Sequence, residues 1–459
     1  MRPITPDIFR AYDIRGLVDQ DFDPEWVEAL GRACGTFFVE NGHSQAVVGR
    51  DCRHSSLSYQ QAMVQGLLDA GVDVVVLPMV PTPVFYYAVR TLNRQAGVMI
   101  TASHNPPEYN GFKIWSGKNT IHSQDIQRIY AIMCSGQFAQ GRGVVSEMDI
   151  VPDYIQSLSS QTSLARPVRV VVDGGNGAGG EICARLLDEI GAEVTQLYCR
   201  PDPDFPNHHP DPTVADNLRD LQAAVREQGA DFGIGLDGDA DRIGVVDEKG
   251  EVMYGDRLLA VFARDLLREH PGAKILAEVK CSHLLFKDIA QNGGDPEMCR
   301  TGHSLIKARM QESGALLAGE MSGHMFFADR YYGFDDAAYA AQRLAEIVAH
   351  QDKPLSALLD DWPPTACTPE IRMDCPDAVK FDVVQRARTH FTPNNDEYQV
   401  IDVDGVRLDL GDGWALVRAS NTQPVLVLRF EAETEQRLGE IREFVQAPLR
   451  GWITDLTRT

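Results

Sequence analysis

The sequence predicts an α/β protein of several domains, and three observations support this fold class. Short apolar runs typical of buried strands alternate with segments of helix length, and the alternation recurs three times. The length of 459 residues exceeds what a single hydrophobic core usually organises, so roughly three or four domains are expected. A Pro-rich stretch at residues 362–369 precedes a final segment with a different pattern. We therefore expect three related α/β domains with mixed sheets, followed by a C-terminal α+β domain.

Each of the three α/β units contains apolar runs that are typical of strands. In the first unit, residues 59–70 form a segment of helix length between two such runs. One strand of every unit runs into a polar loop, which suggests one architecture repeated three times. The predicted strands are residues 46–49, 73–77 and 97–100, then 168–172, 193–198 and 231–236, and then 274–279 and 315–318.

The final segment differs because its strands are closely spaced and joined by short Gly-Asp turns. Residues 406–410, 414–418 and 425–430 predict an antiparallel sheet, and residues 434–445 predict a terminal helix. The Pro-rich linker makes this segment a candidate moving part. The expected domains are residues 1–150, 151–251, 252–364 and 365–459.

Composition and charge limit the possible partners. The chain has 66 acidic and 43 basic residues and a net charge of −23, which argues against nucleic acid or an anionic membrane. Its nine cysteines include no C-x-x-C pair, so reduced thiols are expected and a zinc ribbon is not. The first residues lack a signal-peptide core, and no apolar run approaches the length of a membrane span. We expect a cytoplasmic protein.

The stretch from Thr101 to Pro106 places one hydroxyl at the carboxyl end of a predicted strand. Residues 96–100 form the apolar run, and Pro106-Pro107 prevents any regular continuation, so Ser103 lies on a constrained loop. Ligands of α/β folds bind at such strand ends. An ordinary serine in a turn is the alternative, and the three loops described next favour a functional serine.

Asp237, Asp239 and Asp241 place three carboxylates at alternate positions between two predicted strands. A set of oxygen ligands alone selects a hard divalent cation such as Mg²⁺. Two alternatives are a solvated acidic turn and an EF-hand, for which Glu248 stands at loop position twelve. Arg242 occupies the position where an EF-hand requires Gly, and the flanks resemble strands, so we favour the magnesium loop.

Two further loops offer groups that suit a sugar phosphate. Residues 418–424 combine an Arg fork with hydroxyls and backbone N–H groups, which suits a phosphate dianion, although a polar turn is the alternative. Residues 320–324 offer a carboxylate, a hydroxyl and an imidazole, and a carboxylate can accept from two neighbouring sugar hydroxyls. Taken alone, the second loop is a weak signal, and a solvated turn explains it better.

A Gly-rich stretch, residues 173–180, contains the G-x-G-x-x-G pattern of dinucleotide sites. Such a site requires an acidic residue about twenty positions further on, where this chain has Cys199-Arg200. We therefore favour a structural turn between a strand and a helix.

Together these loops resemble the α-D-phosphohexomutase superfamily along essentially the whole chain, and most closely its bacterial phosphomannomutase/phosphoglucomutase group. The resemblance implies four domains around a central cleft, the fourth similar to the TATA-binding-protein fold. The motifs that carry it are residues 101–106, 237–242, 320–324 and 418–424, supported by residues 12–16, 110–113, 279–280 and 301–304.

The resemblance also implies roles for individual residues. Ser103 would be the catalytic phosphoserine, and its phosphate would complete a Mg²⁺ shell made by Asp237, Asp239 and Asp241. Four residues are candidates for proton transfer or charge stabilisation, namely Arg15, Lys113, His104 and His303, and their order stays open; a structural role for His303 is the alternative. Arg242 would neutralise charge. The substrate-binding residues would be Tyr12, Lys280, Glu320, Ser322, His324, Arg418, Ser420, Asn421 and Thr422.

The implied activity is that of an isomerase. Hexose 1-phosphate and hexose 6-phosphate, of mannose or glucose, would interconvert through a hexose 1,6-bisphosphate that is both intermediate and activator. Phosphoglucosamine mutases of the family usually carry Gln where this chain has Met321, which argues against an amino sugar. The competing hypotheses are a sugar-phosphate phosphatase and a catalytically silent sugar-phosphate binding protein. The expected ligands are small hexose phosphates, with no nucleic acid or membrane, and the chain would be a monomer or a weak oligomer.

Overall fold

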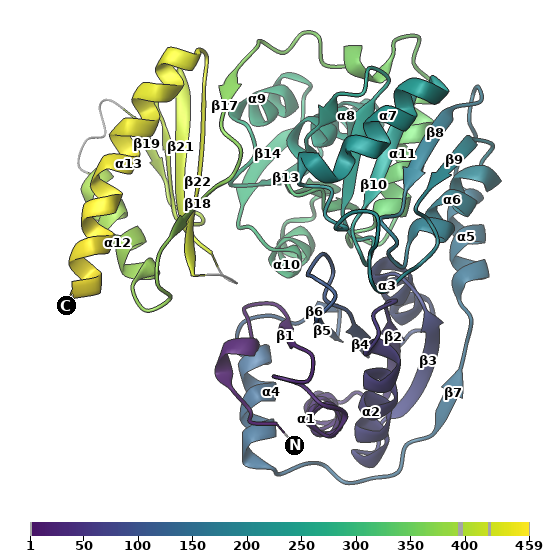
Figure 1. Ribbon diagram of the computed structural model, residues 1–459. Coiled ribbons are helices and arrows are strands. Elements are labelled where there is room, and N and C mark those ends of the chain that lie inside the picture. Colours follow the sequence, from purple (N-terminus) through teal and green to yellow (C-terminus); the bar gives the residue numbers. More distant parts are fainter. Residues whose placement is uncertain (1, 393–397, 421–423, 459) are drawn as a thin grey trace.

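The protein is built from four sheets, each covered by helices (Figure 1). The structure, a computed structural model, describes residues 2–392, 398–420 and 424–458. In Figure 1 the first domain lies below the second and third, and the fourth stands to one side with its helices on the outer face. Among the described helices, none combines the length and apolar character that a membrane span requires.

The first domain contains a seven-stranded sheet in the order β1-β5-β4-β2-β3-β7, with β6 paired to β5. Its strands are β1 (Ile14–Leu17), β2 (Gln45–Arg50), β3 (Asp73–Met79), β4 (Ala96–Ile100), β5 (Tyr109–Ser116), β6 (Asn119–Thr120) and β7 (Val145–Glu147). Its helices are α1 (Pro24–Glu40), α2 (Ser56–Asp69), α3 (Thr82–Thr91) and α4 (Gln124–Ser135), preceded by the 3₁₀ turn Pro6–Ile8.

The second and third domains contain smaller mixed sheets. The second has α5 (Val151–Ser159), β8 (Arg169–Asp173), α6 (Gly180–Glu189), β9 (Glu193–Leu197), the 3₁₀ turn Ala215–Leu218, α7 (Arg219–Gln228), β10 (Phe232–Leu236), β11 (Ile243–Asp247) and β12 (Val252–Met253). The third has α8 (Gly255–Glu269), β13 (Lys274–Glu278), α9 (His283–Gln291), β14 (Asp295–Cys299), α10 (His303–Ser313), β15 (Leu317–Gly319), β16 (Met325–Phe327), α11 (Ala337–Ala349) and the 3₁₀ turn Leu355–Ala357.

One connectivity is repeated in the first three sheets, so the predicted threefold repetition of an α/β unit with a mixed sheet is confirmed. In each unit the first strand lies centrally, the second and third flank it in parallel, and the fourth is antiparallel to the third. The four equivalent strands are β2, β3, β4 and β5, then β8, β9, β10 and β11, then β13, β14, β15 and β16. The link from third to fourth strand therefore falls at the same place in every unit, and it carries Ser103, Asp237 and Glu320 in turn.

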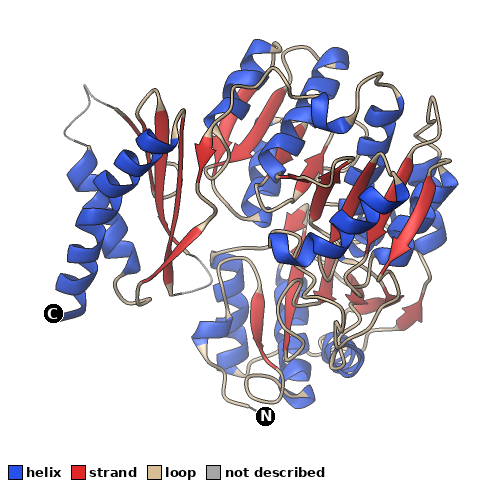
Figure 2. Cartoon of the chain, turned by 45° about the horizontal axis from the view of Figure 1, so that its top comes forward, coloured by secondary structure: helices blue, strands red, loops and turns tan. Residues whose placement is uncertain are grey.

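The fourth domain is the predicted antiparallel α+β unit, with a six-stranded sheet (Figure 2). Its terminal helix continues beyond the predicted end at residue 445 and passes through Pro448, because Leu449 and the residues that follow still pack on this domain's core. Its elements are β17 (Ala366–Cys367), β18 (Ile371–Asp374), α12 (Lys380–Phe391), β19 (Gln399–Ile401), β20 (Val406–Asp409), β21 (Gly413–Ala419), β22 (Val425–Ala432) and α13 (Glu435–Arg458).

The Pro-rich linker predicted at residues 362–369 is shorter in the structure, because its first residue contacts the third domain and residues 366–367 belong to the sheet of the fourth. On one side, the Trp362 indole donates to Asp288 of the third domain over 3.0 Å. On the other side, Ala366 and Cys367 form β17 and pair with β22, so their backbone groups belong to the sheet of the fourth domain. Residues 363–365 separate the two attachments. Movement about this segment stays a prediction.

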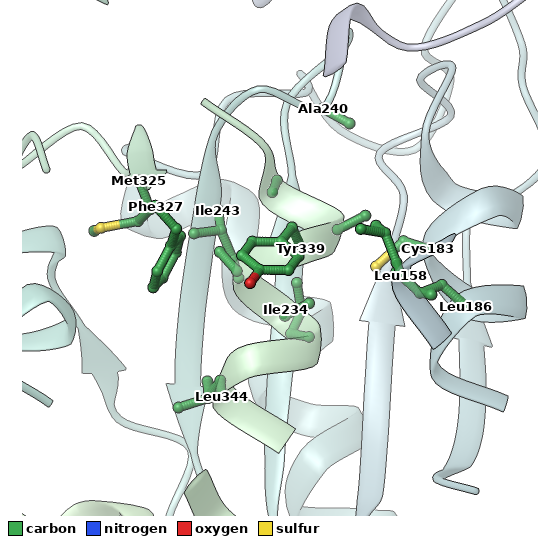
Figure 3. Packing of buried hydrophobic residues seen from close by; sticks show 14 of the residues in the cluster. Leu158, Cys183, Leu186, Ile234, Ala240, Ile243, Met325, Phe327, Tyr339 and Leu344 are labelled. Carbon is green, nitrogen blue, oxygen red and sulfur yellow. The ribbon is translucent and has the colours of Figure 1, made fainter. Parts of the chain in front are cut away.

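A shared core joins the first three domains, whereas the fourth has a core of its own. The largest cluster of buried apolar residues runs from Val47 in the first domain through Ile234 in the second to Tyr339 in the third. Figure 3 shows Tyr339 of α11 packed beside Ile243 of β11. The loops of the first three units are thus held by one continuous interior.

The Gly-rich stretch that follows β8 packs against the aspartate loop. Ala178 N donates to Gly238 O over 3.0 Å. A Cβ added to Gly177 would lie 2.7 Å from the same carbonyl oxygen, which is closer than real Cβ contacts. The glycines are therefore accounted for by close packing of two backbones, as expected for a structural turn.

We expect Gly177→Ala to lower the melting temperature by several degrees, corresponding to roughly 1–3 kcal/mol, because the new methyl group would push the aspartate loop away. Gly439→Ala is the matched control, since an added Cβ there meets nothing within 4 Å and alanine favours the helix α13. Thermal unfolding of both variants measures the difference. Equal melting temperatures for the two variants would contradict the close packing.

Candidate active site

The first and second loops of the repeated units meet at Ser103. Its hydroxyl donates to Asp237 Oδ2 over 2.7 Å, although the two residues are 134 positions apart. Both side chains are buried, Ser103 with 1% of its surface exposed. The serine is therefore held against a carboxylate, away from bulk water.

The loop that carries Ser103 has an unusual backbone conformation and is held from several sides. Ser103 has a φ of +51°, in the left-handed region that side chains other than glycine rarely adopt. Its N–H donates to Thr101 Oγ1 over 2.9 Å. The buried guanidinium of Arg53 donates to Ser103 O over 2.9 Å and to Tyr109 O over 3.0 Å, so one cation holds both ends of the loop.

Three buried carboxylates follow β10. Oxygen atoms of Asp237, Asp239 and Asp241 lie within 4.8 Å of one another, and all three side chains are inaccessible to solvent. Burial raises the pKa of Asp237 well above its usual range, and repulsion by Asp241 and Asp239 raises it further. The flanking elements are strands, as the magnesium-loop interpretation requires and an EF-hand does not.

The donor set of this cluster fits a divalent cation. Asp239 Oδ1 and Asp241 Oδ1 are buried and have no hydrogen-bond partner among the described residues. Carboxylate oxygens left without donors in a dry site are suited to a hard cation such as Mg²⁺. The Ser103 hydroxyl beside Asp237 would bring a phosphate oxygen to the same place.

Lys113 neutralises part of the cluster. It extends from β5 of the first domain, and its ammonium lies 2.7 Å from Asp239 Oδ2 and also contacts Asp241. Burial alone would lower the pKa of Lys113, but Asp239 and Asp241 raise it well above its usual range. Burial alone would likewise raise the pKa of Asp239, yet Lys113 and the Thr82 hydroxyl hold it well below. Lys113 is thus a fixed cation.

A second group of titratable side chains adjoins the aspartate loop. His324 Nδ1 lies 2.9 Å from Asp335 Oδ2 and 3.1 Å from Asp241 O. Its other ring nitrogen, Nε2, accepts a hydrogen bond from Arg242 Nε over 2.9 Å. The rings of His324 and His303 are stacked, with their centres 5.7 Å apart. Asp241, His324 and Asp335 could also enclose an ion, but the hydrogen bonds with Asp241 O and Arg242 Nε already satisfy the imidazole.

His104 is the candidate nearest to the Ser103 hydroxyl. Its Nδ1 lies 3.1 Å from Ser103 Oγ. Burial lowers the pKa of His104 well below its usual value, and the charges of Arg242 and Arg15 lower it further, so the ring is neutral at pH 7. A neutral imidazole can accept a proton at one nitrogen and donate from the other.

The third loop places a carboxylate and a hydroxyl side by side. Glu320 Oε1 accepts from Gly302 N, and its Oε2 accepts from Ser322 Oγ, both over 2.9 Å. Burial alone would raise the pKa of Glu320, but His324 and Lys280 lower it, so the group is ionised. The loop therefore places hydrogen-bond acceptors beside Gly302, His324 and Lys280.

Two cations lie where the third and fourth domains meet. Lys280 Nζ is 3.2 Å from Glu370 Oε2. Arg418 Nε is 3.1 Å from Asp404 Oδ2, an oxygen that also accepts from Thr301 N over 3.1 Å. Asp404 thus links the predicted phosphate-binding Arg418 to the third domain.

Side chains of the fourth domain form hydrogen bonds with the backbone around Lys280. Trp414 lies between two guanidinium groups, with the Arg407 carbon 3.8 Å and the Arg429 carbon 5.6 Å from its ring centre. Arg407 donates to Cys281 O over 2.8 Å, and Arg429 donates to Lys280 O. Buried arginines therefore fix the backbone that presents Lys280.

The structure brings the described predicted site residues into one network. Arg15 donates to Asn105 Oδ1 in the Ser103 loop over 2.9 Å and pairs with Asp13 over 2.7 Å. The Tyr12 ring lies against His303, with ring centres 5.4 Å apart. Ser420 is buried at the end of β21. Asn421 and Thr422 lie outside the described residues.

Sequence reasoning missed several residues of this network. Arg53, Asp335 and Asp404 stand alone between motifs, and nothing in the sequence places them beside the site. Lys307 lies four positions after His303, so the two residues share one face of α10.

All four domains match known family models. The matching descriptions are phosphoglucomutase/phosphomannomutase α/β/α domain I at residues 6–140, domain II at residues 152–250, domain III at residues 254–365 and the C-terminal domain at residues 370–447.

Individual relatives agree over nearly the whole length. A phosphomannomutase/phosphoglucomutase from Pseudomonas aeruginosa is 45% identical over 449 residues, covering 98% of this chain and 96% of that protein. A phosphoglucomutase from Neisseria gonorrhoeae is 42% identical and covers 97% of each chain. The crystal structure of a phosphoglucomutase/phosphomannomutase family protein from Burkholderia thailandensis superposes with a TM-score of 0.92, at 39% identity and 98% coverage of each chain. Fold, site and relatives agree that the chain belongs to the phosphoglucomutase/phosphomannomutase family of the α-D-phosphohexomutases.

Proposed function

We propose that the protein is an isomerase that interconverts hexose 1-phosphates and hexose 6-phosphates of mannose and glucose. A phosphoryl group on Ser103 passes to the sugar, a hexose 1,6-bisphosphate reorients, and Ser103 recovers a phosphoryl group from the other end. The observation that carries the proposal is the Ser103 hydroxyl, 2.7 Å from Asp237 at the edge of a buried carboxylate cluster. Phosphoryl transfer requires mainly alignment and charge neutralisation, which such a site supplies.

The residues that would hold Mg²⁺ are Asp237, Asp239 and Asp241, with an oxygen of phosphorylated Ser103. When bound, the ion neutralises charge on the transferring phosphoryl group. Lys113 remains a cation beside two of these carboxylates and adds positive charge at the same place. Because Lys113 is held protonated, we assign it to charge stabilisation instead of proton transfer.

His324 is the residue best placed to move the sugar proton. Its Nδ1 donates to Asp241 O and lies 2.9 Å from the Asp335 carboxylate, so the lone pair of Nε2 is free to act once the ligand replaces the Arg242 contact. His324 would take a proton from one sugar hydroxyl as that oxygen attacks phosphorus. It would return the proton to the oxygen at the other end of the sugar when that oxygen leaves, so the ring ends each cycle unchanged.

His104 would serve Ser103 in the same way. Its Nδ1 lies within hydrogen-bond distance of Ser103 Oγ, so the neutral ring can take the serine proton when that oxygen attacks phosphorus. The resulting imidazolium, beside the phosphoserine, would return the proton when the serine oxygen leaves. Arg15 has too high a pKa for proton transfer, and its contact with Asn105 supports a role in orienting the loop and supplying charge.

The substrate would be held at both ends. The family resemblance implies that Glu320 and Ser322 bind the sugar hydroxyls at C3 and C4, and their neighbouring oxygen atoms suit two neighbouring hydroxyls. Arg418, Ser420 and Lys280, with Asn421 and Thr422, would bind the phosphate that does not react. Nothing in this arrangement contacts the hydroxyl at C2, where glucose and mannose differ.

Phosphorylation of Ser103 is the first test. Incubation with glucose 1,6-bisphosphate and Mg²⁺ should add one phosphoryl group to the peptide containing Ser103, as seen by intact and peptide mass spectrometry. Ser103→Ala should remain unmodified and lose at least about three orders of magnitude in kcat, because no other group takes the nucleophile's place. A Ser103→Ala variant that isomerises at the parent rate would refute the proposal.

The metal site predicts a difference between two lysine variants. Lys113→Met leaves Asp239 and Asp241 without their ammonium partner, which for a broken buried pair costs about 3–5 kcal/mol, so it should melt earlier than the parent without Mg²⁺. Because its cluster is less neutralised, Mg²⁺ should raise its melting temperature more than that of the parent. Lys274→Met, which removes a lysine paired with Asp295 at the surface, is the control and should respond like the parent. Equal shifts in all three proteins would contradict the assignment.

Because no residue in the proposed arrangement contacts the hydroxyl at C2, we expect the enzyme to accept both glucose and mannose phosphates. The kcat/KM values for glucose 1-phosphate and mannose 1-phosphate should agree within about tenfold, since a site built to bind a hydroxyl discriminates far more strongly. Coupled assays of isomer formation measure both values, and phosphate release without isomer formation would indicate a phosphatase instead. Specificity constants that differ by orders of magnitude would exclude the assignment of the sugar contacts.

A further inference from the structure

Lys307 is a buried cation that the proposed reaction does not use. It lies on α10, and none of its side chain is exposed. Its ammonium is 3.0 Å from Asp335 Oδ1 and 3.2 Å from His303 Nδ1, and 4.2 Å from the centre of the Tyr86 ring. A buried ammonium is unfavourable unless it is paired, so these contacts are specific.

The direction of the contact between Lys307 and His303 follows from the charge of Asp335. Burial alone would raise the pKa of Asp335, but Lys307 and His324 hold it well below its usual range, so it is a carboxylate. Burial lowers the pKa of Lys307, and this carboxylate, 3.0 Å from the amino group, opposes that shift, so the geometry pairs an ammonium with a carboxylate. An ammonium donates three hydrogen bonds and accepts none. His303 Nδ1 must therefore accept, and the proton of the neutral ring lies on Nε2.

The Nε2–H group of His303 is available to a ligand. This nitrogen is buried and has no hydrogen-bond partner among the described residues. Its ring lies between Tyr12 and His324, and the preceding residue, Gly302, donates to the sugar-loop carboxylate of Glu320. A buried N–H without an acceptor is costly, and its position among the predicted ligand-binding residues indicates what its acceptor is.

We propose that Lys307 is a positioning residue that fixes His303 as the Nε2–H tautomer, so that His303 donates a hydrogen bond to an oxygen atom of the bound sugar phosphate. The tautomer follows from the protein's own contacts, and only the identity of the acceptor rests on the proposed function. The Asp335 carboxylate lies between Lys307 and His324, 2.9 Å from His324 Nδ1. His324 has the opposite tautomer, because its Nδ1 donates to Asp241 O and its Nε2 accepts from Arg242. A donor from His303 therefore lies beside an acceptor from His324.

The tautomer is measured directly by long-range proton–nitrogen NMR of the full chain labelled with ¹⁵N-histidine. His303→Gln assigns the signals of His303 by their disappearance. We expect an unprotonated Nδ1 and a protonated Nε2 at neutral pH, whether or not the chain is an active mutase. A proton on Nδ1, or a doubly protonated ring, would overturn the proposal.

Variants of Lys307 test its role. In Lys307→Met the donor to Nδ1 is gone and Asp335 remains 3.9 Å from that nitrogen, so the proton should move to Nδ1. We expect kcat to fall about tenfold or more, with KM changed less, and Lys307→Arg to retain the Nε2–H tautomer and most of the activity. An unchanged tautomer in Lys307→Met would refute the role of Lys307.

A control separates this effect from lost stability. Arg343→Met removes another buried cation of the third domain, which pairs with Asp329 over 2.8 Å and lies outside the site network. It should lower the melting temperature and leave the His303 tautomer and kcat unchanged. If both methionine variants lost kcat equally, the proposal would fail. Should Lys307→Met not fold, the parent spectrum and Lys307→Arg still decide the question.

Discussion

The buried carboxylates of the second domain are the constraint around which the site is arranged. Asp237, Asp239 and Asp241 occupy one tight turn and are all shielded from water. Anions this close repel one another strongly at low dielectric, so the cluster is stable only beside cations. Lys113 provides one of these cations from a strand of the first domain. The same attraction therefore holds the loop of Ser103 against the aspartate loop, and a divalent cation would complete the balance.

Repetition of one sheet connectivity explains why loops so distant in sequence converge. In each α/β unit the turn from the third to the fourth strand carries the polar groups, and a single apolar interior joins the three units. The position of each turn is thus set by the packing of apolar side chains that are not themselves part of the proposed active site. The Gly-rich stretch after β8 follows the same logic, because its glycines permit the close approach that supports the aspartate loop.

The fourth domain relates to the site in a different way. It has a hydrophobic core of its own. At its interface with the third domain, the buried side chains of Arg407 and Arg429, which both lie against the Trp414 ring, donate hydrogen bonds to backbone carbonyls. These hydrogen bonds, together with a small apolar cluster of Val279, Trp414 and Leu416, fix where Lys280 and Arg418 lie relative to Glu320. The residues that we propose to bind the substrate therefore come from both of these domains.

The sequence by itself determined those features whose residues are neighbours along the chain. Alternating apolar runs predicted the sheets and their repetition, and the loops of Ser103, Asp237 and Glu320 were recognisable because their chemical groups stand next to one another. Short strands such as β17 and the run of α13 past Pro448 were missed, because long-range packing overrode local signals. Only the tertiary structure decided which distant groups pair, as Lys113 does with Asp239. Where a histidine carries its proton depends on such partners, and no local pattern encodes them.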